Sequence, residues 1–113
     1  PLVSQAVAHG LMAPMAIKQL ECYEAAMTFA KTEGMIIAPE SSHAVAATIR
    51  KALEAKAEGK ERVILFNLSG HGLMDLAGYN KFMKGELKNA ELSQKELDET
   101  LERSVKGNPV PAL

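Results

Sequence analysis

Two short apolar runs, residues 35–38 and 63–66, most constrain what this chain can fold into. Each run follows a stretch of helical periodicity that a glycine closes, Gly34 in the first case and Gly59 in the second. Each run then gives way to a turn rich in polar residues and glycine. Helices that alternate with short buried strands are typical of βαβ units, which build a parallel sheet. We therefore expect an α/β fold, a partial parallel sheet with helices on its faces.

The helices around these runs are predicted from the spacing of apolar residues. Such residues recur at helical spacing from Leu20 to Ala30, and a second helix begins with Ser41 or Ser42 as its cap and continues to about Glu58. The residues expected to form the buried stripe of this second helix are Val45, Ile49, Ala52 and Leu53. Those expected to face water are Arg50, Lys51, Glu54 and Lys56.

The two ends of the chain carry weaker patterns. We expect a helix over residues 2–9 and a short edge strand over residues 14–17. The whole of residues 1–113 is expected to form a single domain, a piece of a longer protein. Within it, residues 92–113 are expected to form an amphipathic terminal helix and an irregular tail.

A capping box marks the start of that terminal helix. The Ser93 side chain can accept the Glu96 amide while the Glu96 carboxylate reaches back to Ser93, and Leu92 against Leu97 adds a hydrophobic staple. Gly107 is expected to end the helix. The apolar stripe expected along it comprises Leu97, Leu101 and Val105.

Composition argues against several classes of function. A length of 113 residues, with 47% apolar and 24% charged residues, is that of one ordinary globular domain. A net charge of −1 gives no reason to expect nucleic acid or an anionic membrane as partner. No run approaches ~18 apolar residues, so we expect no transmembrane helix. Cys22 is the only cysteine, which fits a reducing compartment and a cytoplasmic location.

Two turns could carry chemistry, because each lies at the carboxyl end of an expected strand. Ser69 directly follows the second run and is flanked by Gly70 and Gly72, so its hydroxyl should have open space beside it. Glu40 lies where a strand ends and a helix begins, a position that favours a carboxylate. Each residue also has a structural alternative, because Ser69 could cap its own turn and Glu40 could cap the helix.

Three other readings of these turns are rejected. His43, His71 and Cys22 do not have the spacing of a zinc site. The trio of Ser69, His71 and Asp75 lacks the G-x-S-x-G elbow of a hydrolase. The turn also lacks the glycine spacing of a phosphate-binding loop.

The two turns together resemble one enzyme family. The first reads EGMIIAPESSHA over residues 33–44, and the second reads NLSGHG over residues 67–72, with a helix and an apolar strand between them. In this order they resemble tryptophan synthase beta chains, of the alternative class common in archaea and thermophiles. These enzymes depend on pyridoxal phosphate and have the fold called type II. The resemblance covers roughly residues 21–87 and extends more loosely over residues 1–20.

The resemblance implies a role for several residues. The serine at the position of Ser69 hydrogen-bonds the pyridine nitrogen of the cofactor, and Gly70 lies next to it in the same turn. The glutamate at the position of Glu40 lies beside the cofactor ring, with Ser41 in the same helical turn. His71 stands where the commoner class of beta chain carries arginine, which puts in doubt any arginine salt bridge at this loop. The lysine that forms an imine with the cofactor and the glycine-rich phosphate loop have no counterpart here, so we expect no catalytic residue.

The resemblance implies that residues 1–113 are a carboxyl-terminal fragment of the pyridoxal-phosphate-binding domain of a beta chain. The parent enzyme would join indole to L-serine, could bind an alpha subunit and would form a homo-oligomer, whereas this chain alone should be inactive. One alternative is a fragment of a related enzyme of the same fold, such as a threonine synthase or a serine/threonine dehydratase. Another alternative is a small α/β interaction module without catalytic activity.

Overall fold

The computed structural model describes residues 2–90 and 93–105, without the side chains of residues 104 and 105. The chain divides into two compact units, of which the larger comprises residues 17–89. The smaller unit is formed by residues 1–16 and 90–113. The larger unit contains every residue predicted to carry chemistry.

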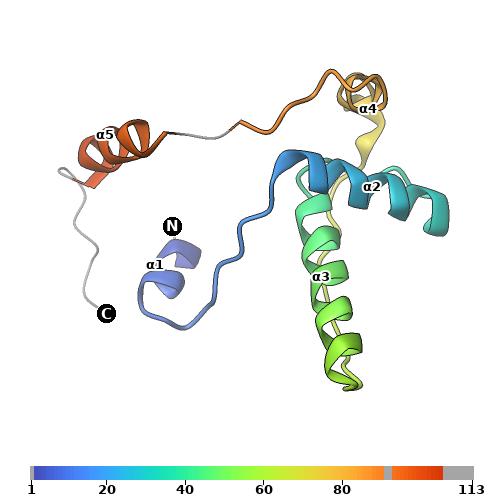
Figure 1. Ribbon diagram of the computed structural model, residues 1–113, viewed down its shortest axis with the longest axis horizontal. Coiled ribbons are helices and arrows are strands. Elements are labelled where there is room, and N and C mark those ends of the chain that lie inside the picture. Colours follow the sequence, from blue (N-terminus) through green and yellow to red (C-terminus); the bar gives the residue numbers. More distant parts are fainter. Residues whose placement is uncertain (1, 91–92, 106–113) are drawn as a thin grey trace. The chain divides into compact units, whose positions relative to one another are not determined.

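Two helices, α2 (Gln19–Glu33) and α3 (Ser42–Glu58), form the frame of the larger unit. They cross near the amino end of α3, and residues 59–71 then lead back to this crossing, as Figure 1 shows. A short 3₁₀ turn, η1 (Gly72–Met74), and the helix α4 (Leu76–Met83) follow and pack near α2. The core lies where these elements meet, and its buried members are Ala25, Ala26, Ile37, Val45, Ala46 and Tyr79.

Two of the three glycines predicted to end helices, Gly34 and Gly59, do so. Gly34 ends α2 with φ of 71°, and its amide donates to the Ala30 carbonyl. Gly59 ends α3 with φ of 65°, and its amide donates to carbonyl groups of the preceding helical turn. Both backbones are in the left-handed region, where a side chain would be strained and glycine is not. The two central helices therefore begin and end close to the predicted residues.

The predicted sheet is wrong. Among the described residues the structure is helical, without a strand over residues 14–17, 35–38 or 63–66. The last two segments are extended, but they do not form a hydrogen-bonded ladder with each other or with another segment of the described chain. An extended segment gains stability as a strand only when neighbouring strands satisfy its backbone groups. The two apolar runs have the composition of strands. The described residues do not provide the neighbouring strands with which they could pair.

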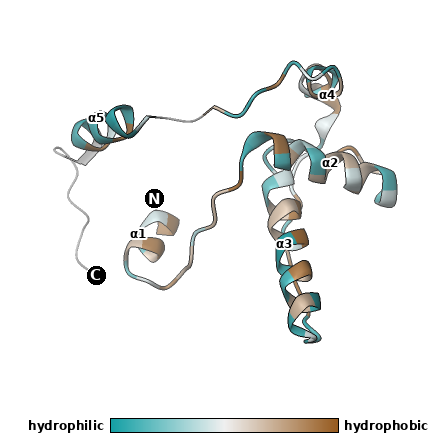
Figure 2. Cartoon of the chain, in the orientation of Figure 1, coloured by the Kyte–Doolittle hydropathy of each residue, from teal (hydrophilic) through white to brown (hydrophobic). Residues whose placement is uncertain are grey.

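The buried stripe predicted along α3 is correct only near the crossing with α2. Val45 is buried there, whereas Ile49 is 37% exposed and Leu53 is 60% exposed. Figure 2 shows hydrophobic stretches recurring along α3 beyond the crossing. The periodicity of a helix predicts which face is apolar, but a packing partner decides how much of that face is buried.

An ion pair joins α2 to α3 through Arg50, a residue that was predicted to face water. The Arg50 Nε atom donates to Glu21 Oε1 at 2.5 Å, and its Nη2 atom donates to Glu21 Oε2. This hydrogen bond holds the pKa of Glu21 below its ordinary value and raises that of Arg50. The two side chains are 36% and 42% exposed, so solvent screens the pair.

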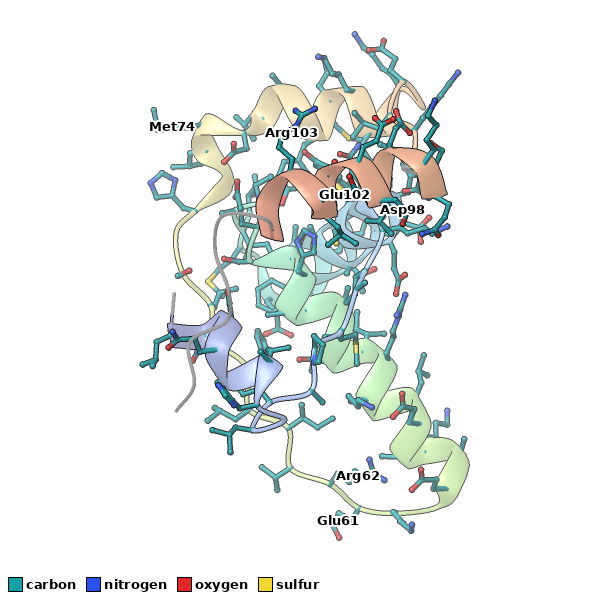
Figure 3. All side chains as sticks on the ribbon, turned by 90° about the vertical axis from the view of Figure 1, so that its left-hand side faces the viewer. Glu61, Arg62, Met74, Asp98, Glu102 and Arg103 are labelled. Carbon is teal, nitrogen blue, oxygen red and sulfur yellow. The ribbon has the colours of Figure 1, made fainter. Side chains whose placement is uncertain are left out.

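A second ion pair lies at the far end of α3. Arg62 Nη2 donates to Glu58 Oε2 at 2.6 Å across the turn that Gly59 opens. Figure 3 labels Glu61 and Arg62 on this turn. This end of α3 is therefore charged and solvent-facing, and the candidate chemistry lies at the opposite end.

The smaller unit contains the helices α1 (Leu2–Ala8) and α5 (Gln94–Val105). The capping box at the start of α5 is confirmed, because Glu96 Oε2 accepts the Ser93 amide at 2.8 Å and the Ser93 hydroxyl at 2.7 Å. The Glu96 amide in turn donates to Ser93 Oγ at 3.3 Å. Leu92 and Gly107, predicted to form the staple and the helix end, lie outside the described residues.

α5 is mostly hydrophilic, as Figure 2 shows, and its acidic and basic residues Asp98, Glu102 and Arg103 are labelled in Figure 3. On the described part of its predicted apolar stripe, Leu97 is 40% exposed and Leu101 is 50% exposed. A search of the described helices finds none with the length and apolar character needed to cross a membrane.

Candidate functional site

Two segments that are distant in the sequence meet at the amino end of α3. We call residues 36–42 the glutamate segment and residues 67–72 the serine loop. The amide of Gly72 donates to the Ile36 carbonyl at 2.9 Å. A Cβ atom on Gly72 would lie 2.4 Å from the Ile37 carbonyl oxygen, closer than real contacts allow. The absence of a side chain at Gly72 therefore lets the two backbones touch.

A second glycine shapes the same loop. Gly70 has φ of 73°, in the left-handed region that favours glycine. A Cβ atom there would meet the Ala38 Cβ atom at 3.4 Å, an ordinary contact distance. Gly70 is therefore needed for the direction of the turn, whereas Gly72 is needed for the close approach.

A side chain completes the contact between the two segments. The Ser41 hydroxyl donates to the carbonyl oxygen of Ser69, and Ser41 itself is only 8% exposed. Ser41 is the N-cap residue of α3, as predicted, but its hydroxyl does not make the usual capping hydrogen bond. The Ser42 hydroxyl donates to the Pro39 carbonyl. Ser41 instead ties the start of α3 to the serine loop.

The structure thus brings the predicted site residues into one region. Ser69 and Gly70 lie on the serine loop, Glu40 and Ser41 lie on the glutamate segment, and the Ser41–Ser69 hydrogen bond joins the two. The side chains of Ser69 and Glu40 are exposed, so both are accessible to a bound molecule. His71 is also exposed and has an extended backbone before η1.

Glu40 borders a hollow between the amino ends of α2 and α3. The hollow has a volume of about 220 Å³, and its walls are formed by Gln19, Cys22, Tyr23, Pro39, Glu40 and His43. Nδ1 of His43 lies 3.2 Å from the Glu40 carbonyl oxygen, so this histidine packs onto its own helical turn. The wall combines a carboxylate, an amide and an imidazole with an aromatic ring, a mixture suited to a small polar molecule.

Cys22 forms a buried part of this wall rather than a reactive group. It is 2% exposed, and burial raises the pKa of its thiol above the ordinary value, although a hydrogen bond with Ser42 opposes the shift. A thiol with a raised pKa is a weak nucleophile near neutral pH. Within residues 2–90 and 93–105, no three His, Cys, Asp or Glu side chains gather closely enough to hold a metal ion.

The sequence analysis missed an aromatic cluster behind the site. Tyr79 is 4% exposed, and its hydroxyl donates to the Ile37 carbonyl at 2.6 Å. Its ring meets Tyr23 edge-on at 5.3 Å, and Tyr23 stacks on Phe82 at 5.4 Å. Burial raises the pKa of both tyrosines above the ordinary value. The only signal in the sequence is the presence of Tyr79 and Phe82 on one short helix, which does not reveal their partners.

Comparison with known proteins agrees with the family resemblance of the two turns. The relatives that the chain matches are named as enzymes that synthesise an amino acid. More specifically, the chain belongs to the tryptophan synthase beta chains, as the two turns predict. It is 58% identical over 91 residues to the tryptophan synthase beta chain of Thermococcus onnurineus (strain NA1), a match that covers 80% of this chain and 20% of the relative. No model of a protein family matches the chain.

Two further relatives are similar to the same extent. Tryptophan synthase beta chain 2 of Pyrococcus furiosus is 57% identical over 91 residues, which is 80% of this chain and 20% of the relative. Tryptophan synthase beta chain 2 of Aquifex aeolicus is 54% identical over 87 residues, which is 77% of this chain and 20% of the relative. The chain therefore spans about a fifth of the length of these relatives.

Proposed function

We propose that this chain supplies one wall of the pyridoxal-phosphate site of a tryptophan synthase beta chain, a lyase that joins indole to L-serine. The observation that carries the proposal is the docking of the serine loop on the glutamate segment through Ser41 and Ser69. This contact joins the two motifs that define the family resemblance. The identity of 58% to a beta chain supports the same assignment.

The residues of the site fit the cofactor chemically. A pyridine nitrogen accepts a hydrogen bond, and the exposed Ser69 side chain carries a hydroxyl that can donate one. Bound pyridoxal phosphate supplies a ring that withdraws electrons from the amino acid attached to it. A serine leaves the ring nitrogen neutral, whereas a carboxylate would keep it protonated. In our proposal Ser69 thus keeps the ring in its neutral form, which withdraws electrons less strongly than the protonated form.

The other proposed residues act around Ser69. Ser41 is buried and holds the serine loop through the Ser69 carbonyl, so its hydroxyl sets the position of Ser69. Gly70 gives the loop its left-handed turn. Glu40 presents an exposed carboxylate beside the hollow, where it can orient the bound ring and exclude competing anions. We assign no catalytic residue within this chain.

The proposal extends to partners and location. Relatives named tryptophan synthase beta chains suggest indole and L-serine as substrates and an alpha subunit as partner. We further propose a homo-oligomer in the cytoplasm. Cys22 is a free, buried thiol, which fits a reducing compartment.

The test places this chain in a whole enzyme. Residues 17–89, the larger unit, replace the corresponding segment of the Pyrococcus furiosus beta chain, and the chimaera is loaded with pyridoxal phosphate. We expect it to make tryptophan from indole and L-serine. Ser69→Ala should lower turnover and shift the absorption maximum of the cofactor, because the ring nitrogen loses its donor.

A matched control separates this role from folding. Thr28→Val and Thr32→Val remove hydroxyls that bond only to carbonyls of α2, outside both site segments, so neither should alter the cofactor spectrum. A folded chimaera that binds no cofactor would contradict the proposed function. A Ser69→Ala chimaera with an unchanged spectrum and unchanged turnover would remove Ser69 from the site.

A further inference from the structure

Tyr79 holds the glutamate segment from behind. Its hydroxyl donates to the Ile37 carbonyl at 2.6 Å, while the preceding carbonyl, that of Ile36, accepts the Gly72 amide at 2.9 Å. Two consecutive carbonyl groups of the segment are therefore bound by residues of the serine loop and of the helix that follows it. Ile37 is 2% exposed, so few other donors can reach this part of the backbone.

The Tyr79 ring has little freedom to move. It lies edge-on to Tyr23 with an interplanar angle of 81°, and Tyr23 is in turn stacked on Phe82. A Cβ atom on Gly78 would lie 2.4 Å from the Tyr23 hydroxyl oxygen, so α4 and Tyr23 are in direct contact. The packed rings fix where the Tyr79 hydroxyl points and hence where the Ile37 carbonyl lies.

The segment between the serine loop and Tyr79 is short, and backbone hydrogen bonds connect its residues to one another. The Asp75 amide donates to the Gly72 carbonyl at 3.0 Å, and the Asp75 carbonyl accepts the amides of Gly78 and Tyr79. α4 is therefore joined to the serine loop through η1 and to the glutamate segment through the Tyr79 hydroxyl. A shift of α4 would move both segments that form the site.

We propose that Tyr79 is a positioning residue, whose hydroxyl sets the glutamate segment against the serine loop and so places Glu40 and Ser69 for the cofactor. This inference rests on the proposed function for the identity of the cofactor. The contact between Tyr79 and Ile37 does not depend on it, and the two can be tested separately.

The first measurement uses this chain as it is. Tyr79→Phe keeps the ring and its packing but leaves the Ile37 carbonyl without its donor. We expect hydrogen exchange at the Gly72 and Ser42 amides to accelerate about tenfold, the factor for one lost hydrogen bond of ordinary strength. Thr48→Val is the matched control, because Thr48 also donates a hydroxyl to a backbone carbonyl, that of Ala44 within α3 at 2.9 Å.

The second measurement uses the chimaera described above with pyridoxal phosphate bound. Tyr79→Phe should shift the absorption maximum of the cofactor and raise KM for L-serine several-fold, because Ser69 and Glu40 lose their alignment. Thr48→Val should do neither. If Tyr79→Phe only lowered the stability of the chimaera, its unfolding midpoint would fall. The cofactor spectrum of the folded enzyme would then stay unchanged.

Each outcome supports or overturns the inference. Faster exchange at Gly72 with a shifted cofactor spectrum supports it. Unchanged exchange, or faster exchange with an unchanged spectrum and unchanged KM, shows that Tyr79 only packs and overturns it. If the wild-type chimaera binds no cofactor, the proposed function is wrong, and exchange at Gly72 still decides whether the Tyr79 hydroxyl holds the two segments together.

Discussion

At the scale of single residues, the site depends on the missing side chain of Gly72 and on the hydroxyl groups of Ser41 and Tyr79. Gly72 brings two backbones into contact, and the two hydroxyls then bind carbonyl groups on either side of that contact. Carbonyl groups removed from water are costly to leave without a partner, so each hydroxyl specifies one arrangement of the two segments. The position of Ser69, to which we assign a role in our proposal, therefore depends on Gly72, Ser41 and Tyr79.

The first prediction concerns Gly72. Gly72→Ala places a Cβ atom against the Ile37 carbonyl oxygen, a backbone atom that cannot move away as a side-chain end could. We expect the free energy of unfolding to fall by about 1–3 kcal/mol, the usual effect of overpacking. Urea unfolding measures it.

The adjacent residue provides the control. Leu73 is 63% exposed, so Leu73→Ala should change the free energy of unfolding by less than about 0.5 kcal/mol. Equal stability of Gly72→Ala and the wild-type chain would show that the two backbones do not meet at this glycine.

At the scale of elements, the helices of this chain begin and end through local chemistry. Gly34 and Gly59 end α2 and α3 in left-handed conformations, and the capping box of Ser93 and Glu96 begins α5. These interactions lie within one turn of helix, which is why they could be predicted from spacing alone. The extended segments are different, because a strand needs a partner distant in the sequence.

The second prediction is a pH dependence of α5. Hydrogen bonds from the Ser93 hydroxyl and amide hold the pKa of Glu96 below its ordinary value. Because the pKa is lower in the helix than in the unfolded segment, the capping box stabilises α5 above the unfolded pKa. That stability is lost as the pH falls through the lower pKa of the helix. Amide chemical shifts of residues 94–105 should therefore move away from helical values in acid.

Two variants check this assignment. Glu96→Gln should remove the pH step, because the amide does not titrate. Ser93→Ala removes one donor, so the pKa of Glu96 should rise toward that of an ordinary glutamate. A pH step that persists in Glu96→Gln would assign it to another carboxylate of α5.

At the scale of the whole molecule, the larger unit leaves much apolar surface uncovered. Val63 is 99% exposed and Leu65 is 93% exposed, while Ile64 and Phe66 between and beyond them are partly buried. Phe66 meets Phe29 of α2 edge-on at 6.3 Å. One side of this extended segment therefore packs on the unit, and the other side presents apolar side chains and unpaired backbone to water.

The third prediction is that the isolated chain self-associates. Extended apolar segments with unpaired backbone groups recruit other chains. Sedimentation equilibrium at micromolar concentrations should show dimers or larger species, and replacing both Val63 and Leu65 with lysine should shift the equilibrium toward monomer. Met74 is 90% exposed but lies on η1, as Figure 3 shows, so Met74→Lys should leave association unchanged. A monomer at all concentrations would contradict this prediction.

The fourth prediction is that the isolated chain has no activity. The described lysines, such as Lys31, Lys51 and Lys84, lie in helices or at the surface, and the resemblance gives the imine-forming lysine no counterpart here. Titration with pyridoxal phosphate should therefore give no saturable, single-site imine absorption, and indole with L-serine should give no tryptophan. A saturable band that one lysine substitution abolishes would show this prediction to be wrong.

The sequence by itself determined the helices, the glycines that end them, the capping box of α5 and the kinship with tryptophan synthase beta chains. Each depends on residues a few positions apart or on motifs that can be read directly. Only the tertiary structure decided that residues 35–38 and 63–66 do not pair as strands. It also decided that Ser41 binds Ser69, 28 positions away, and that Tyr79 binds Ile37, 42 positions away. Such contacts depend on how the folded chain brings distant segments together. A hydrogen bond from a single hydroxyl produces no periodic pattern in the sequence, so its distant partner cannot be predicted.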